Sequence, residues 1–237
     1  MSRFSALKAI YDFYDEFTNG LSIACQKGCH VCCTTNVTAT SLETDYLIQS
    51  GKMDKHLLKK MEEERQKDHF IPSTTINTTA ALCLAQKAIP EETSSQTFEP
   101  CPLLDENGLC SVYEYRPFSC RAMCSDTVCT EGGQANMPPF LVTVNLALYQ
   151  ILEHIDREGW YGNLLDMIPL SLAGRERAGN LAVDQEGTIK TNRQLPCFIV
   201  PPDDKIRFKS FMRRLGSQSA DEITLAELLP EEYSILS

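Results

Sequence analysis

The 237-residue sequence contains no apolar run near the roughly 18–20 residues that a membrane-spanning helix requires. It begins Met1-Ser2-Arg3 without a basic head, an apolar stretch and a small-residue cleavage site, so we expect no export signal. A surplus of basic residues is also missing, since the net charge is −10 and the isoelectric point is near 4.9. Because an acidic chain without a basic stripe is unsuited to a phosphate backbone, we expect neither nucleic acid nor a membrane as a partner.

The number of cysteines is not even. The chain has 11 cysteines, whereas a closed disulfide framework would favour an even number. Together with the missing export signal, this predicts a protein of the reducing cytoplasm, where thiols stay free to bind metal. With 43% hydrophobic residues, a chain of this length buries a real core, as one domain or slightly more.

Cysteines are what the sequence has in abundance, and ten of the 11 lie between Cys25 and Cys129. Four of them fall within nine residues, in the run Cys25-Gln-Lys-Gly-Cys29-His-Val-Cys32-Cys33. Packing does not explain this spacing, because a cysteine needed for its apolar bulk has no reason to lie beside another. Thiolates two or three residues apart can turn onto one centre, and both zinc and iron–sulfur clusters use such spacings. The run therefore predicts a soft metal centre.

Hydrophobic residues recur at helical spacing along much of the chain, which predicts a mainly α fold: an irregular helical domain with cysteine-rich metal-binding loops and little strand. The expected helices cover residues 4–19, 41–49, 53–69, 79–88, 140–157, 164–178, 206–215 and 222–229. The second of these has the clearest start, since Thr40-Ser-Leu-Glu43 has the form of a capping box. Residues 90–115 read as loop, with a turn at Asp105-Glu-Asn-Gly108.

We expect two parts along the chain. Residues 1–178 contain all but one of the cysteines and should form a cysteine-cluster metal-binding domain. Residues 179–237 should form a C-terminal helical extension that packs on it.

The second group of cysteines carries the more specific pattern. It reads Cys101-Pro-Leu-Leu-Asp, then Cys110-Ser-Val-Tyr-Glu-Tyr-Arg-Pro-Phe-Ser-Cys120-Arg121, followed by Cys124 and Cys129. Proline after Cys101 fixes φ and favours an extended loop. Arg121 has two interpretations that the sequence does not separate: a cation that keeps neighbouring thiols deprotonated, or a member of a surface ion pair.

In this order the motifs resemble the YkgJ-like cysteine-cluster family, whose CxxCxxCC domain is described as zinc- or iron-chelating. The resemblance covers roughly residues 5–175 and implies eight metal ligands. Carried over by position, these are Cys25, Cys29, Cys32, Cys33, Cys101, Cys110, Cys120 and Cys129. The segment after Cys120 is shorter than the family pattern implies and contains Cys124, so Cys124 and Cys129 both stay open as the eighth ligand. The family has no settled general activity, so the resemblance implies a chemistry and not a role.

The adjacent pair Cys32 and Cys33 bears on the number of centres. Neighbouring side chains in an extended segment point to opposite sides, so both rarely reach one metal. Eight thiolates and this pair predict two centres, with Cys32 facing one and Cys33 the other. The alternative is a single four-cysteine centre, with the remaining thiols packed or redox-active.

The sequence leaves the metal open, because zinc and iron–sulfur clusters both accept four cysteines. Cys25-x-x-x-Cys29-x-x-Cys32 also has the spacing by which radical S-adenosylmethionine enzymes hold a cluster with one open iron. Val31 stands where those enzymes favour an aromatic residue, and Cys33 is available to fill the open position. His30, inside the same run, is a further candidate ligand.

Two functions from different classes remain. The first is a non-catalytic metalloprotein with a structural, redox or electron-transfer use, and the second is an iron–sulfur enzyme that uses S-adenosylmethionine, such as a protein methylase. For both functions we expect a protein partner, which would be a redox partner or a substrate. Of the other cysteines, Cys83 is expected to be a small buried hydrophobe in an Ala-rich helix, and Cys197 to lie in an apolar segment against the core.

Overall fold

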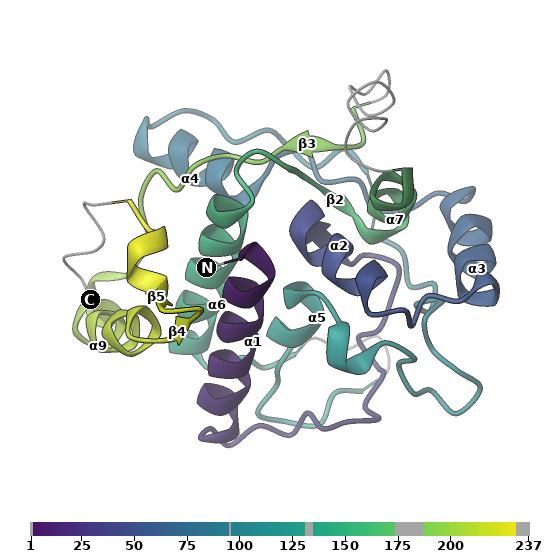
Figure 1. Cartoon of the computed structure of the whole chain (residues 1–237), viewed down its shortest axis with the longest axis horizontal. Helices are drawn as coiled ribbons and strands as arrows, with labels where there is room; N and C mark the ends of the chain where they lie inside the picture. Colours follow the sequence, from purple (N-terminus) through teal and green to yellow (C-terminus); the bar gives the residue numbers. More distant parts are fainter. Residues whose placement is uncertain (1, 95, 131–134, 174–186, 231–237) are drawn as a thin grey trace.

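The computed structural model describes residues 2–94, 96–130, 135–173 and 187–230, and the fold is mainly helical (Figure 1). The α-helices are α1 (Arg3–Asn19), α2 (Ser41–Gln49), α3 (Lys55–Arg65), α4 (Ile76–Leu84), α5 (Phe118–Ala122), α6 (Pro139–Ile155), α7 (Leu164–Ala173) and α9 (Lys205–Gly216). The strands are β1 (Thr38–Thr40), β2 (Trp160–Asn163), β3 (Lys190–Thr191), β4 (Ser219–Ala220) and β5 (Ile223–Thr224). Short 3-10 turns occur at η1 (Tyr113–Tyr115), η2 (Pro202–Asp204) and η3 (Leu225–Leu228).

The first hydrophobic core lies among α1, α6 and α9, which run close together in Figure 1. Apolar residues of α1 repeat every three or four positions, as Leu7, Ile10 and Tyr14 do, and so bury one stripe of the helix. Helix α6 has a wider stripe and begins at Pro139, whose fixed φ suits the first helical position. Phe211 of α9 packs against Phe13 of α1, with the ring centres 5.4 Å apart.

The second core lies among α2, α3 and α7. Helix α2 begins at the predicted capping box, in which the Thr40 side chain accepts the N–H of Glu43 and the Glu43 side chain accepts the N–H of Thr40. Leu103 and Val112 also belong to this core, although they come from the loop that carries the second cysteine group. The second core therefore anchors that loop.

A small antiparallel sheet in the order β1-β2-β3 connects the two halves of the chain. Thr38 of β1 pairs with Asn163 of β2, and Trp160 of β2 pairs with Thr191 of β3. Strand β1 follows the first cysteine group directly and leads into α2. The sheet therefore fixes the end of the first cysteine loop beside the second core.

The predicted fold class is confirmed, and most predicted helices are present with shifted ends. The helix expected at 53–69 covers only Lys55–Arg65, and the one expected at 79–88 lies earlier, at Ile76–Leu84. The helix expected at 222–229 is wrong: Asp221 and Glu222 adopt φ values of 53° and 66°, and only β5 and the turn η3 follow. The end of the helix expected at 164–178 and the expected boundary at 178/179 lie outside the described residues. No helix in the described ranges combines the length and apolarity that crossing a membrane would require.

Candidate metal centre

The first cysteine group lies in the loop between α1 and β1, and local turns shape it. Gly28 has a φ of 95°, which glycine adopts without the steric cost of a Cβ. The N–H of Cys29 donates to the carbonyl of Gln26 at 3.0 Å, and the N–H of Cys33 donates to that of His30 at 2.9 Å. These two tight turns bring the thiols of the loop onto one side of the molecule.

The second cysteine group begins in a hairpin-like loop. Leu104 and Cys110 form an isolated antiparallel bridge, which closes the loop that contains the predicted turn. Asp105 Oδ1 accepts the N–H of Leu109 at 2.8 Å, and Gly108 has the left-handed φ of 73° that this turn requires. With Leu103 and Val112 buried in the second core, the loop holds Cys101 and Cys110 next to each other.

Helix α5 carries Cys120 and is fixed by a buried carboxylate. Glu43 Oε1 accepts the N–H of Phe118 at 2.7 Å and the hydroxyl of Tyr11 at 2.9 Å. The Phe118 ring is fully buried in the first core, in edge contact with Tyr14. The predicted capping-box residue thus joins α1, α2 and α5 and sets the position of Cys120.

Direct backbone contacts join the two cysteine groups. The N–H of Cys101 donates to the carbonyl of Cys33 at 2.9 Å. Nearby, the Asn36 side chain bonds the backbone of Thr97 twice, with its Nδ2 donating at 2.7 Å and its Oδ1 accepting at 3.0 Å. Asn36 carries no local sequence signal of this role, because only the fold brings Thr97 beside it.

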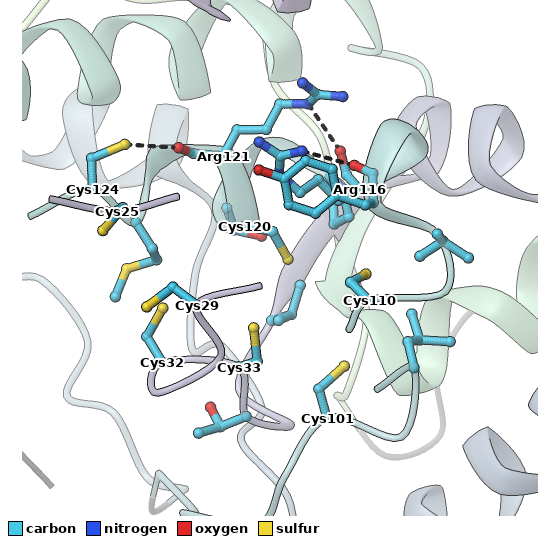
Figure 2. A pocket seen from close by; sticks show the side chains of 18 of the residues that line it. Cys25, Cys29, Cys32, Cys33, Cys101, Cys110, Arg116, Cys120, Arg121 and Cys124 are labelled. Carbon is cyan, nitrogen blue, oxygen red and sulfur yellow. Dashed lines mark hydrogen bonds between the residues drawn. The ribbon is translucent and has the colours of Figure 1, made fainter. Parts of the chain in front are cut away.

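The two groups therefore lie together, as metal centres shared between them would require. Eight cysteines line one cavity of about 740 Å³: Cys25, Cys29, Cys32, Cys33, Cys101, Cys110, Cys120 and Cys124. Figure 2 shows Cys101 and Cys110 on one side of it, the loop with Cys29 and Cys32 on the other, and Cys33 and Cys120 between them. Within the described ranges, no three histidine, cysteine, aspartate or glutamate side chains are already gathered closely enough to hold one ion. The donor set suits a soft metal, and the thiols would have to close further around it.

Four of these cysteines form an inner set: Cys33, Cys101, Cys110 and Cys120. Burial raises the pKa of the Cys120 thiol, and the nearby charges of Cys101 and Cys110 raise it further. For Cys33, the hydrogen bond with Cys32 raises the pKa most, then burial, and Cys120 and Cys101 add to it. These influences link Cys120 with Cys101, Cys110 and Cys33, and the largest influence on Cys33 is its neighbour Cys32.

The other three cysteines of the first group form an outer set: Cys25, Cys29 and Cys32. Burial raises the pKa of the Cys25 thiol, a backbone N–H lowers it, and the charges of Cys29, Cys129 and Cys32 raise it again. Cys29 is exposed, and none of the inner-set cysteines is. Cys32 lies between the sets, because it interacts with Cys33 and also raises the pKa of Cys120.

Backbone N–H groups point at two sulfurs of the inner set in the same way. Burial raises the pKa of the Cys101 thiol to about 11, and the N–H of Leu103 lowers it. Burial also raises the pKa of Cys110, and the N–H of Val112 lowers it. In both cases the donor lies two residues after the cysteine, where it stabilises a thiolate more than a thiol. Metal binding would release the protons that burial retains on these sulfurs.

Arg116 supplies positive charge beside the inner set. Its guanidinium lies 3.8 Å from the centre of the Tyr113 ring and donates to the carbonyl of Tyr113 at 2.8 Å. Against the larger effect of burial, its charge lowers the pKa of both Cys110 and Cys120. This electrostatic role was one of the two interpretations of Arg121, and it belongs instead to Arg116.

Arg121 is a buried structural residue. Its Nη1 donates to Asp15 of α1 at 2.7 Å, its Nη2 donates to the carbonyl of Glu114 at 2.7 Å, and its guanidinium stacks 4.2 Å from the centre of the Tyr11 ring. Of the two interpretations, the ion pair is correct. It is not a surface pair on the arginine side, because the Arg121 side chain is only 4% exposed. Arg121 therefore holds the chain after Cys110 against α1.

The end of the second group lies beside Cys25. Ala24 donates its N–H to the carbonyl of Ser125 at 2.7 Å, and the N–H of Ser125 donates to Cys25 Sγ at 3.2 Å. Cys124 is buried and its thiol donates to a backbone carbonyl at 3.2 Å, drawn as a dashed line in Figure 2. Cys129 does not line the cavity but is close enough to shift the pKa of Cys25. Both candidates for the eighth ligand are thus near the outer set.

The remaining candidates lie apart or have other partners. His30 is exposed, and its Nδ1 is 3.3 Å from the carbonyl of Gly28. Cys83 is exposed, so the expectation that it is a buried hydrophobe is wrong: the end of α4 projects it from the core. Cys197 is half-buried. The cysteines at 83 and 197 do not line the metal cavity.

Comparison with known proteins gives one match. Residues 24–136 match the model of the CxxCxxCC family, which is described as a "putative zinc- or iron-chelating domain". The matched segment contains both cysteine groups. Neither the curated proteins nor the solved structures gave a match.

Proposed function

Because residues 24–136 match the model of the CxxCxxCC family, we propose that this protein holds two thiolate-ligated metal centres. The inner centre is held by the inner set, Cys33, Cys101, Cys110 and Cys120. The outer centre is held by the outer set with a fourth ligand, Cys25, Cys29, Cys32 and Cys129. The observation that carries the proposal is that Cys32 acts on the pKa of Cys25, whereas Cys101 acts on that of Cys33, even though both residues also lie near Cys120.

Cys129 is chosen as the eighth ligand because the alternative, Cys124, already has hydrogen-bond partners. The Cys124 thiol donates to the Arg121 carbonyl at 3.2 Å and lies 3.9 Å from the hydroxyl of Tyr14. Drawing Cys124 toward a metal would break its bond to the Arg121 carbonyl, whereas the Tyr14 hydroxyl would keep its bond to Asn145 Oδ1 at 2.7 Å. Cys129 has no such bond among the described contacts and lies near Cys25.

The inner centre is proposed to be structural. Cys101 and Cys110 come from a loop anchored in the second core, and Cys120 comes from α5, which is anchored in the first. Cys33 brings in the loop that follows α1. Four ligands from these segments would tie both cores together, and the N–H groups of Leu103 and Val112 would stabilise two of the thiolates.

The outer centre is proposed to serve redox sensing or electron transfer with a protein partner in a reducing cytoplasm. Its ligand Cys29 is exposed, so a partner can approach it closely. Zinc would supply a structural crosslink at either centre, whereas an iron–sulfur cluster would add one-electron chemistry. The chain's own contribution is the fixed turns at Cys29 and Cys33 that hold the outer set at the surface.

Anaerobic purification followed by metal and sulfide analysis tests this proposal. We expect two centres' worth of zinc, or of iron with sulfide, per chain. A brown protein with a broad visible absorption band would identify iron–sulfur clusters, and a colourless zinc protein would identify zinc. Protein that purifies anaerobically without either metal, and takes up neither on reconstitution, would contradict the proposal.

A second function has one observation in its favour. Because Cys33 neighbours the inner set, Cys25, Cys29 and Cys32 stand apart as a three-cysteine motif that could hold a cluster with one open iron. The protein would then be an iron–sulfur enzyme that uses S-adenosylmethionine, such as a protein methylase. Equilibrium dialysis of the anaerobically reconstituted protein with S-adenosylmethionine separates the two functions. Binding that is lost in Cys29→Ser would favour the enzyme, and no binding would favour the non-catalytic protein.

A further inference from the structure

Two cysteines outside the metal site lie on two neighbouring segments in a different part of the fold. Cys83 is exposed in the last turn of α4, and Cys197 is half-buried in the segment that leads from β3 to α9. The Cys197 thiol points at the carbonyl of Ala80, 4.0 Å away, and Ala80 precedes Cys83 by one helical turn. After burial, the charge of Cys83 is what raises the pKa of the Cys197 thiol. The Cys197 sulfur therefore lies against the helical turn that carries Cys83.

Buried polar contacts on α6 fix the two segments relative to each other. The Gln150 side chain donates to the carbonyl of Cys197 at 2.7 Å. The Asn77 side chain, in the first turn of α4, donates to the carbonyl of Gln150 and to that of Arg193, each at 3.0 Å. Asn77 and Gln150 are almost fully buried. Because α4 and the 193–197 segment share these anchors, the approach of the two thiols is built into the fold.

We infer that Cys83 and Cys197 form a thiol–disulfide site that reacts with small-molecule disulfides independently of the metal cysteines. The Cys83 thiolate attacks one sulfur of oxidised glutathione, which forms a mixed disulfide and releases one glutathione thiolate. The Cys197 thiolate then attacks the Cys83 sulfur, which forms the Cys83–Cys197 disulfide and releases the second glutathione. The protein loses two electrons and two protons, and one glutathione disulfide is reduced to two thiols.

The order of the two steps follows from exposure. Cys83 is exposed and is open to the oxidant, whereas Cys197 is half-buried and has a higher pKa than an ordinary thiol. The closed disulfide would tie the segment before α9 to α4. It would thereby hold the C-terminal part of the chain on the body of the protein when the surrounding thiol pool becomes oxidised.

Peptide mapping of the metal-loaded protein after anaerobic incubation with oxidised glutathione tests the inference. Trypsin should release Cys83 in residues 68–87 and Cys197 in residues 194–205, each with no other cysteine. We expect these two peptides to be joined by a disulfide that dithiothreitol cleaves, with the metal content unchanged. The melting temperature should rise by roughly 5 °C or more, because the crosslink closes a long loop of the unfolded chain.

Two variants test the two steps separately. Cys197→Ser should stop at the mixed disulfide of Cys83 with glutathione, and Cys83→Ser should leave Cys197 largely unmodified. A wild-type protein that carries only the mixed disulfide at Cys83 would overturn the inference. So would a disulfide that joins either residue to one of the metal cysteines.

Discussion

Removal of the metal is expected to lower the melting temperature by roughly 10–20 °C, and Cys110→Ala should have a similar effect with a loss of solubility. The reason is that the cysteine loops have little regular structure, with only η1 and the five-residue α5 between Cys101 and Cys124. Metal binding at a structural zinc site contributes about 10–16 kcal/mol in isolated peptides. Even a part of this energy is large compared with the free energy of unfolding of a domain. Differential scanning fluorimetry with and without a chelator measures the effect.

Cys83→Ala is the matched control, because Cys83 is exposed and lies outside the metal cavity. Its free energy of unfolding should change by less than about 1–2 kcal/mol. Cys29→Ala should also impair folding, but less than Cys110→Ala, since Cys29 is exposed and Cys110 joins the second core. Three variants with identical melting curves would show that the centres are not structural.

Glu43→Ala is expected to destabilise the metal-loaded protein by about 3–5 kcal/mol, the cost of leaving several buried groups without a partner. Glu43 is 5% exposed and accepts the N–H of Phe118, the hydroxyl of Tyr11, and both the N–H and the hydroxyl of Thr40. The Phe118 bond holds the start of α5, so inner-centre metal should fall as well because Cys120 is displaced. Urea unfolding with metal analysis of the folded protein measures both effects.

Two substitutions serve as controls for Glu43. Glu43→Gln keeps the size of the side chain and an acceptor oxygen, so it should cost less than Glu43→Ala and retain most of the inner-centre metal. Glu62→Ala removes an exposed carboxylate on α3 whose described partners are the nearby Arg65 and Gln66, and should cost less than about 0.5–1 kcal/mol. Glu43→Ala that matches Glu62→Ala in both stability and metal content would contradict this role.

The sequence predicted the helices in which apolar residues recur at helical spacing over several turns. Helices α1 and α6 have long apolar stripes, and the capping box fixed the start of α2 at Ser41. The sheet was not predicted, because its strands have two to four residues and are too short for alternation to show. At 222–229 the Thr224–Glu227 box begins only a 3-10 turn, since the two preceding residues have positive φ.

For the site, the hypothesis of metal centres shared by the two cysteine groups implied that the groups approach each other, but not how. The approach depends on the Cys101–Cys33 backbone bond and on the Asn36 side chain, and both arise only once the chain is folded. The position of Arg121 next to Cys120 fitted both a cation beside the thiols and a member of an ion pair, so the sequence did not separate the two roles. Only the packing of Arg121 against α1 leaves Arg116 as the charge beside the thiols.

The adjacent cysteines provide the most direct test of two centres. Metal content per chain should be measured in Cys32→Ser, Cys33→Ser, the Cys32→Ser/Cys33→Ser double variant and the Cys33→Ser/Cys101→Ser double variant. We predict that each single variant loses about one centre's worth of metal, and that the 32/33 double variant loses both. The 33/101 double variant should lose no more than Cys33→Ser alone, because both residues belong to the inner set. Complete loss in either single variant, or no loss in one of them, would contradict the account.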